Sequence, residues 1–161
     1  MQGTSKENQN AFYPITRIWK PVTFQGANKK KHYFEGWYFK IVSPCERYAF
    51  ALIPGISMDG GGQQHAFIQL LDGKACTSAY HEFPHEAFQP LPNRFEVQLG
   101  PNRFTDQGFN VSLPELDGEL RFHGNTPWPA TLGAPGIMGW YAFVPFMECY
   151  HGIVSLHHKL E

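Results

Sequence analysis

The stretch HYFEGWYFKIV, residues 32–42, decides the fold, because aromatic and β-branched side chains at this density are typical of a β-strand. Strand alternation predicts one face made of Tyr33, Glu35, Trp37, Phe39 and Ile41. The other face would hold Phe34, Gly36, Tyr38, Lys40 and Val42, and its lysine marks it as the wetter side. Glu35 is therefore expected on the apolar face, unless a bulge at Gly36 shifts the alternation.

The rest of the chain also predicts short strands, because thirteen prolines and sixteen glycines leave little room for long helices. Strand-like runs lie at residues 46–53, 65–72, 109–114 and 118–124. Asp72-Gly73 predicts a two-residue hairpin, and the near-repeat PNRFEVQLG-PNRFTDQG at residues 92–108 predicts a second hairpin. We therefore expect an all-β protein, either an antiparallel barrel or a strongly curved sandwich.

Three segments depart from this pattern of short strands and turns. Residues 1–30 are mostly irregular, and Ile15, Trp19 and Phe24 are the residues that would pin them across a sheet. Residues 126–146 are apolar and Pro/Gly-rich, and they form either a functional lid or plug, or a structural crossover that closes one end of a barrel. HGIVSLHHKL, residues 151–160, predicts a final strand immediately before the chain stops at Glu161. We therefore expect a fragment of a longer protein, whose last strand offers an edge to a missing C-terminal half or to a homodimer.

Composition excludes several classes of function. The formal net charge of -1 does not suggest nucleic acid or an anionic membrane as the main partner. Cys45, Cys76 and Cys149 form neither a CxxC pair nor a disulfide framework, so a reducing cytoplasm is the expected location. No run approaches the ~18 apolar residues of a transmembrane segment. Phosphate-binding and dinucleotide-binding glycine motifs are absent from the sequence, so we expect no cofactor.

Glu35 is the first candidate catalytic residue. Burial among aromatic side chains favours the neutral carboxylic acid, which can donate a proton. The alternative is a structural glutamate that is salt-bridged to an arginine such as Arg47. His151 is the second candidate, because the neighbouring Glu148 and Tyr150 bring an acid, a phenol and an imidazole together. An ordinary polar strand face is the alternative there.

HEFPH, residues 81–85, matches the HExxH pattern of zinc proteases. That pattern binds a metal only on a helix, where both histidines share one face. Pro84 inside the motif opposes a helix, and no third ligand lies at a recognisable spacing. We therefore predict no metal site.

Two blocks resemble the tocopherol cyclase-like family: YFEGWYFKI at residues 33–41, and GIMGWYAFVPFMECYHGIVSLHH at residues 136–158, the latter as in bacterial members. The resemblance starts near Trp19 and covers most of the chain, but the Lys-Asp-Trp-Gly motif of the family's second half is absent. It implies a lipocalin-like β domain at residues 31–160, with the irregular segment 1–30 packed on it. Family members often carry two such barrels and are related to carotenoid hydratases.

Plant members of that family add a phenol across a prenyl double bond, which requires a proton donor and a dry aromatic cavity. For this chain the resemblance implies a hydrophobic isoprenoid or lipid-like ligand, with Glu35 as the acid and His151 assisting. The implied ligand-binding residues are Tyr33, Trp37, Tyr38, Phe39, Trp140 and Tyr150. A carrier or sensor without catalysis would use the same pocket. A carbohydrate-binding β-sandwich, in which exposed Trp and Tyr stack on sugars, is the third possibility.

Overall fold

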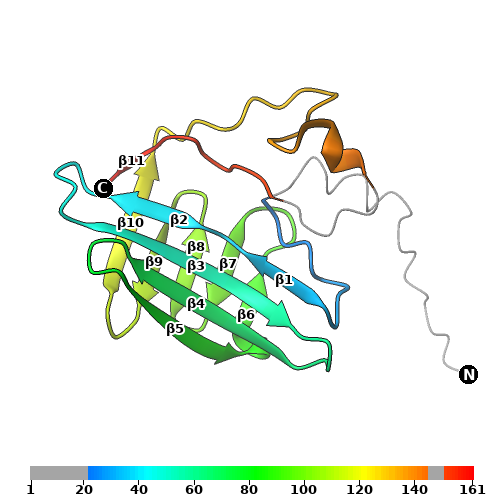
Figure 1. Cartoon of the computed structure of the whole chain (residues 1–161), viewed down its shortest axis with the longest axis horizontal. Coiled ribbons are helices and arrows are strands. Elements are labelled where there is room, and N and C mark those ends of the chain that lie inside the picture. The colour runs from blue at the N-terminus through cyan, green and yellow to red at the C-terminus, as the bar shows by residue number, and fades with distance from the viewer. Residues whose placement is uncertain (1–21, 145–150) are drawn as a thin grey trace, which may run out of the picture.

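The computed structural model describes residues 22–144 and 151–161, and its strands form two antiparallel sheets (Figure 1). The first sheet contains β1 (Tyr33–Gly36), β2 (Phe39–Val42), β3 (Ala49–Met58), β4 (Gln64–Asp72) and β5 (Thr77–Pro84). The second contains β6 (Phe88–Pro90), β7 (Glu96–Leu99), β8 (Asn102–Thr105), β9 (Gly108–Ser112), β10 (Asp117–His123) and β11 (Lys159–Leu160). The all-β antiparallel prediction is confirmed, in the form of a sandwich and not of a closed barrel.

Residues 33–42 form β1 and β2, which follow each other along the same edge of β3. β1 pairs with the end of β3 and β2 with its start, so Glu35 lies opposite Ile56 and Phe39 opposite Leu52. Between them, the Trp37 backbone N–H still donates a hydrogen bond of 3.0 Å to the Pro54 carbonyl. The alternation therefore passes Gly36 without a shift, and the predicted inner and outer faces are both correct.

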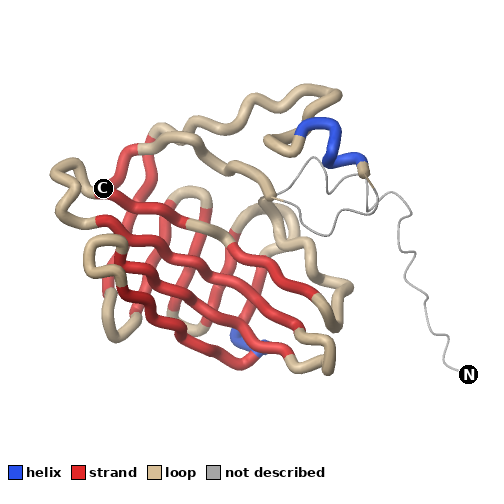
Figure 2. The backbone as a smooth tube through the Cα atoms, in the orientation of Figure 1, coloured by secondary structure: helices blue, strands red, loops and turns tan. Residues whose placement is uncertain are grey.

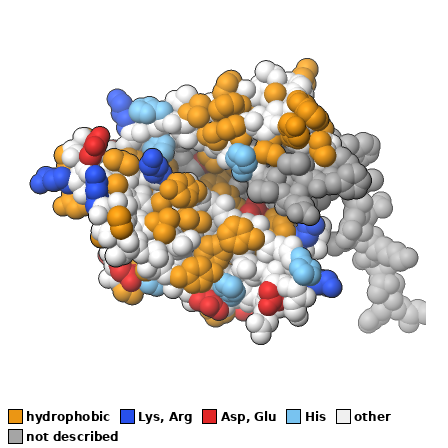
Figure 3. All heavy atoms as spheres, viewed as in Figure 1, with side chains coloured by type: hydrophobic (Ala, Val, Ile, Leu, Met, Phe, Trp, Pro, Cys, Tyr) orange, Lys and Arg blue, Asp and Glu red, His pale blue; other side chains and the backbone are white. Residues whose placement is uncertain are grey.

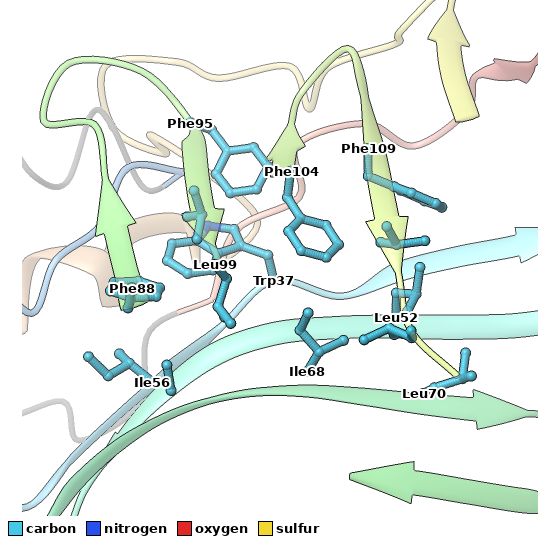
Figure 4. Close-up of a cluster of buried hydrophobic side chains, with 14 of the residues drawn as sticks. Trp37, Leu52, Ile56, Ile68, Leu70, Phe88, Phe95, Leu99, Phe104 and Phe109 are labelled. Carbon is cyan, nitrogen blue, oxygen red and sulfur yellow. The ribbon is translucent and has the colours of Figure 1, made fainter. Parts of the chain in front are cut away.

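The core lies between the two sheets, where apolar side chains from both inner faces meet (Figure 4). The Trp37 ring stacks on Phe88 at 6.1 Å and on Phe95 at 5.3 Å between ring centroids. Further along the same face, Phe39 contacts the rings of Phe95, Phe104, Phe109 and Phe122. The inner face of residues 33–41 is thus packed against aromatic side chains of the second sheet.

The predicted hairpins are largely confirmed. The near-repeat forms β7 and β8, and the next two runs form β9 and β10. The prediction of a two-residue turn at Asp72-Gly73 is wrong, because the turn between β4 and β5 spans residues 73–76. Asp72 Oδ1 accepts hydrogen bonds from the backbone N–H groups of Lys74 and Ala75, which stabilises this longer turn.

The predicted strand at residues 151–160 is wrong except for β11, which pairs with β10. Residues 155–157 run beside the crossover instead, where the backbones of Thr126 and Leu156 are hydrogen-bonded at 2.8 Å. The tube view shows how little helix the described chain holds (Figure 2), namely η1 (His85–Ala87) and η2 (Gly139–Phe143), which lies in the crossover. Within the described ranges, no helix is long and apolar enough to cross a bilayer.

Candidate functional site

Glu35 lies on the inner face of β1, and two donors converge on its carboxyl group. The Tyr33 hydroxyl donates a hydrogen bond of 2.6 Å to Oε2. The backbone N–H of Gln25 lies 2.8 Å from Oε2 and 3.2 Å from Oε1. Both Tyr33 and Glu35 are half-buried. β1 brings the phenol and the carboxyl together because residues i and i+2 of a strand share one face.

The segment that supplies the Gln25 amide, residues 22–26, is here called the strap. Its Val22 carbonyl accepts a hydrogen bond of 3.0 Å from Trp37 Nε1. The Phe24 ring packs edge-on against Phe88 at 5.1 Å between centroids and against Tyr33 at 6.5 Å. The strap is therefore fixed to the inner face of residues 33–37 by two backbone hydrogen bonds and by aromatic contacts.

This geometry limits what Glu35 can do while the strap is in place. Hydrogen bonds from a phenol and from a backbone amide occupy oxygen atoms of the Glu35 carboxyl group. Proton donation to a bound molecule requires one carboxyl oxygen to be released from these donors. Because Gln25 contributes a backbone group, movement of the strap would remove this donor without any change in β1.

The other predicted site residues are only partly brought together. Phe39 and Trp37 share the inner face with Glu35. Tyr38 points to the outer face and is 62% exposed, so an interior site does not include it. Trp140 lies on η2, where it is exposed and stacks on Tyr141.

His151 and Tyr150 complete the set of predicted site residues. His151 is exposed, and no hydrogen bond or ion pair within the described part of the chain joins it to Glu35. Tyr150 and Glu148 lie outside the described residues. The predicted partner Arg47 is found in the turn between β2 and β3, where its Nε donates to Cys45 Sγ. The described site is therefore the group of Tyr33, Glu35 and Trp37 beneath the strap.

The sequence predicted that segment 1–30 packs on the β domain, but it did not predict the hydrogen bond from Gln25 to Glu35 or the rings that enclose Trp37. Gln25 acts through its backbone N–H, which no side-chain pattern reports. Phe88 and Phe95 come from the second sheet, and their pairing with Trp37 depends on how the two sheets are superposed. The sequence signal for the strap was Phe24, which with Ile15 and Trp19 was expected to pin the irregular segment across a sheet; Ile15 and Trp19 lie outside the described residues.

HEFPH forms the end of β5 and the start of η1 and not a regular helix, so the geometry that the zinc pattern needs is absent. His81 faces inward and its Nε2 lies 2.8 Å from Glu115 Oε2, whereas Glu82 is exposed on the opposite face. Among the described residues, no group of three or more His, Cys, Asp or Glu side chains is placed to hold a metal ion.

Two open hollows lie along β8, β9 and β10, away from Glu35. The larger has a volume of about 200 Å³ and is lined in part by Arg103, Asn110 and Arg121. The smaller has a volume of about 100 Å³ beside Phe109 and Leu116. Both are smaller than the roughly 300–1,000 Å³ typical of small-molecule sites, so neither is the candidate site.

Cys45 is a reactive group outside the core. It is exposed in the turn before β3, and Ser43 Oγ and Arg47 Nε each lie 3.5 Å from its Sγ. Two side-chain hydrogen bonds lower the pKa of the Cys45 thiol to about 7, and the one from Ser43 has a larger effect than the one from Arg47. A substantial part of Cys45 is therefore thiolate at neutral pH, which is the nucleophilic form.

We expect the rate of Cys45 alkylation by iodoacetamide to rise with pH and to reach half of its maximum near pH 7, because the thiolate forms there. Ser43→Ala removes the strongest stabilising hydrogen bond and should move this midpoint to higher pH. Peptide mass spectrometry measures the labelling, with the exposed Cys76 as an internal reference. An unchanged midpoint in Ser43→Ala would contradict this explanation.

Comparison with known proteins gives no assignment: no family model, no curated protein and no solved structure matches the chain. The resemblance of residues 33–41 and 136–158 to the tocopherol cyclase-like family therefore remains a hypothesis based on two motifs.

Proposed function

We propose that this chain is a tocopherol cyclase-like domain that binds a hydrophobic isoprenoid or lipid-like molecule beneath the strap. The observation that carries the proposal is the hydrogen-bonded pair of Tyr33 and Glu35 on a face that is otherwise apolar and rich in aromatic side chains. A carboxyl group and a phenol at the end of an apolar core provide polar recognition for a ligand with one hydroxyl group. The aromatic side chains provide the apolar contact for its hydrocarbon part.

Ligand entry requires the strap to move, because the interior around Trp37 is packed. Trp37 is 8% exposed, and Phe88 and Phe95 cover its ring. Displacement of residues 22–26 would break the Trp37–Val22 and Gln25–Glu35 hydrogen bonds and uncover the Glu35 carboxyl group. A ligand hydroxyl can then replace the Gln25 amide as the donor to Glu35.

The catalytic form of the proposal is an acid-promoted addition within one substrate molecule. The Glu35 carboxylic acid would transfer its proton to the alkene carbon, and the phenol oxygen would bond to the cationic carbon so formed. The phenol proton then returns to the Glu35 carboxylate, which restores the acid. The faces of Trp37 and neighbouring rings favour the developing positive charge. The carrier or sensor form uses the same binding site without this step.

The test is retention of a ligand, followed by its conversion. The full chain is incubated with a bacterial lipid extract or with a prenylated phenol, separated from the excess by gel filtration, and analysed by mass spectrometry. We expect a retained hydrophobic molecule, and conversion of the prenylated phenol to a cyclic ether. Glu35→Gln should retain the ligand and lose conversion by at least about a hundredfold, within the range for loss of a general acid.

Glu46→Gln is the matched control, because Glu46 is an exposed glutamate in the turn before β3. Equal conversion by wild type and Glu35→Gln would exclude the acid role. Retention without conversion in the wild type would leave the carrier form of the proposal. No retained molecule from either source would contradict the binding proposal itself.

A further inference from the structure

The outer face of the first sheet is unusually apolar for a face turned to solvent. In a two-sheet sandwich, outward residues along each strand are normally polar. Here the outward residues of β3 are Ala49, Ala51, Ile53, Gly55 and Ser57, as the pairing with β1 and β2 fixes. Hydrophobic side chains gather across the front of this sheet in the space-filling view (Figure 3). The packing of the core therefore does not explain why this outer face is apolar.

Three aromatic rings from three strands form a row on this face. Phe34 of β1 stacks on Phe67 of β4 at 5.5 Å between ring centroids, with 17° between the ring planes. Phe67 stacks in turn on Tyr80 of β5 at 5.2 Å and 14°. Phe67 is 2% exposed, whereas Phe34 is 66% and Tyr80 51% exposed. The buried middle ring thus holds two exposed rings in nearly parallel planes.

The row is built on Gly55, which lies between β1 and β4. A Cβ atom at this position would lie 2.5 Å from the Phe67 ring, so only glycine leaves room for the ring to lie across β3. Because the rings are positioned by paired strands and not by a loop, their spacing is fixed before any ligand arrives. A preformed aromatic surface loses little entropy when it binds.

Polar groups that can donate and accept hydrogen bonds surround Tyr80. His65 Nε2 lies 2.8 Å from the Tyr80 hydroxyl. Strand pairing places Gln69 directly opposite Tyr80, and Glu82 lies two residues along β5 on the same face. Burial and the nearby Glu82 raise the pKa of Tyr80, which keeps the phenol protonated and able to donate.

We propose that this face binds a neutral glycan, with pyranose rings stacking on Phe34 and Tyr80 while sugar hydroxyls pair with Gln69, His65 and Glu82. A pyranose has one face of C–H groups that carry partial positive charge, which the negative face of an aromatic ring attracts. Its hydroxyl groups are both donors and acceptors, and a carboxylate such as Glu82 accepts from them strongly. This site is separate from Glu35, which lies on the opposite face of the sheet.

The charge of the face favours this ligand over two other classes of partner. Among the described strand residues of the outer face, the charged side chains are Lys40 and Glu82, one of each sign, so a highly charged polymer finds no complement. A bilayer would remove water from Gln69, His65 and Glu82 without supplying partners, which costs free energy. Glycan hydroxyls supply those partners.

The test is native affinity electrophoresis of the full chain in gels that contain xylan, mixed-linked β-glucan, hydroxyethyl cellulose or starch. We expect at least one of these polymers to slow the wild type. Phe34→Ala and Tyr80→Ala should each weaken binding about tenfold or more, as expected when an aromatic contact is removed. Tyr80→Phe keeps the ring and should keep most of the binding.

Tyr48→Ala is the matched control, because Tyr48 is 66% exposed but lies in the turn before β3 and outside the row. Circular dichroism checks that each variant is folded. Failure of all four polymers to slow the folded wild type would overturn the proposal, and so would equal losses in Tyr48→Ala and Tyr80→Ala. Binding to phosphatidylglycerol vesicles or self-association that Tyr80→Ala abolishes would also overturn it, by assigning the face to a lipid surface or to a second copy.

Discussion

Trp37→Ala is expected to lower the free energy of unfolding by about 3–5 kcal/mol, the usual cost of truncating a large buried aromatic side chain. Trp37 is 8% exposed, stacks on two phenylalanines and holds the strap through its indole N–H. The substitution leaves a cavity between the sheets and removes the donor to the Val22 carbonyl. Both losses act on the same end of the sandwich.

Urea denaturation of the full chain measures this change. Trp140→Ala is the control for the same substitution at an exposed position, because Trp140 is 63% exposed on η2. Exposed substitutions usually change stability by about 0.5 kcal/mol or less. If Trp37→Ala and Trp140→Ala had equal unfolding midpoints, the packing of Trp37 between the two sheets would be contradicted.

The inner face of residues 33–41 was predictable from the sequence, because a half-buried strand repeats with a period of two residues. Lys40 marked the outer side, and Glu35 then had to face inward. The hairpins of the second sheet were equally visible, since proline, glycine and asparagine punctuate the apolar runs. These features depend on neighbours within a few residues along the chain.

The contacts that define the candidate site were not visible in this way. The Gln25 amide reaches Glu35 from ten residues away through a backbone group, which any non-proline residue supplies equally well. Residues 151–158 have strand-like composition but largely lack sheet pairing, because composition reports what a strand tolerates and not which neighbour it has. The strap and the C-terminal segment are both fixed by tertiary contacts.

The aromatic row was hidden for a different reason. The centre of β4 places three apolar residues in succession, Ala66, Phe67 and Ile68, so its sequence does not reveal that Phe67 points outward while Ile68 points inward. Gly55 appeared as one of many glycines. The structure makes these two residues a pair, because the Phe67 ring lies over the position that a Gly55 side chain would occupy. A glycine under an aromatic ring on a neighbouring strand is a known way to pair them.

Gly55→Ala is therefore expected to destabilise the chain by about 1–3 kcal/mol, the range for adding a methyl group where no space exists. The added Cβ would lie 2.5 Å from the Phe67 ring and 2.6 Å from the Glu35 backbone oxygen. The first contact displaces the aromatic row, and the second pushes β1 away from β3. Relative to the wild type, Gly55→Ala should therefore accelerate deuterium exchange at the amides of β1 more than at those of β4.

Gly61→Ala is the control, since a Cβ there meets its nearest neighbour at an ordinary 3.4 Å in an exposed loop. In a Phe67→Ala background, Gly55→Ala should cost about 1 kcal/mol less, because the ring contact is gone and only the backbone contact remains. Equal stability of Gly55→Ala and Gly61→Ala would contradict the close approach of β1, β3 and the Phe67 ring. If Gly55→Ala destabilised the Phe67→Ala variant as much as it destabilises the wild type, the whole effect would come from the contact with the Glu35 backbone. Gly55 would then be needed for the pairing of β1 with β3 and not for the position of the Phe67 ring.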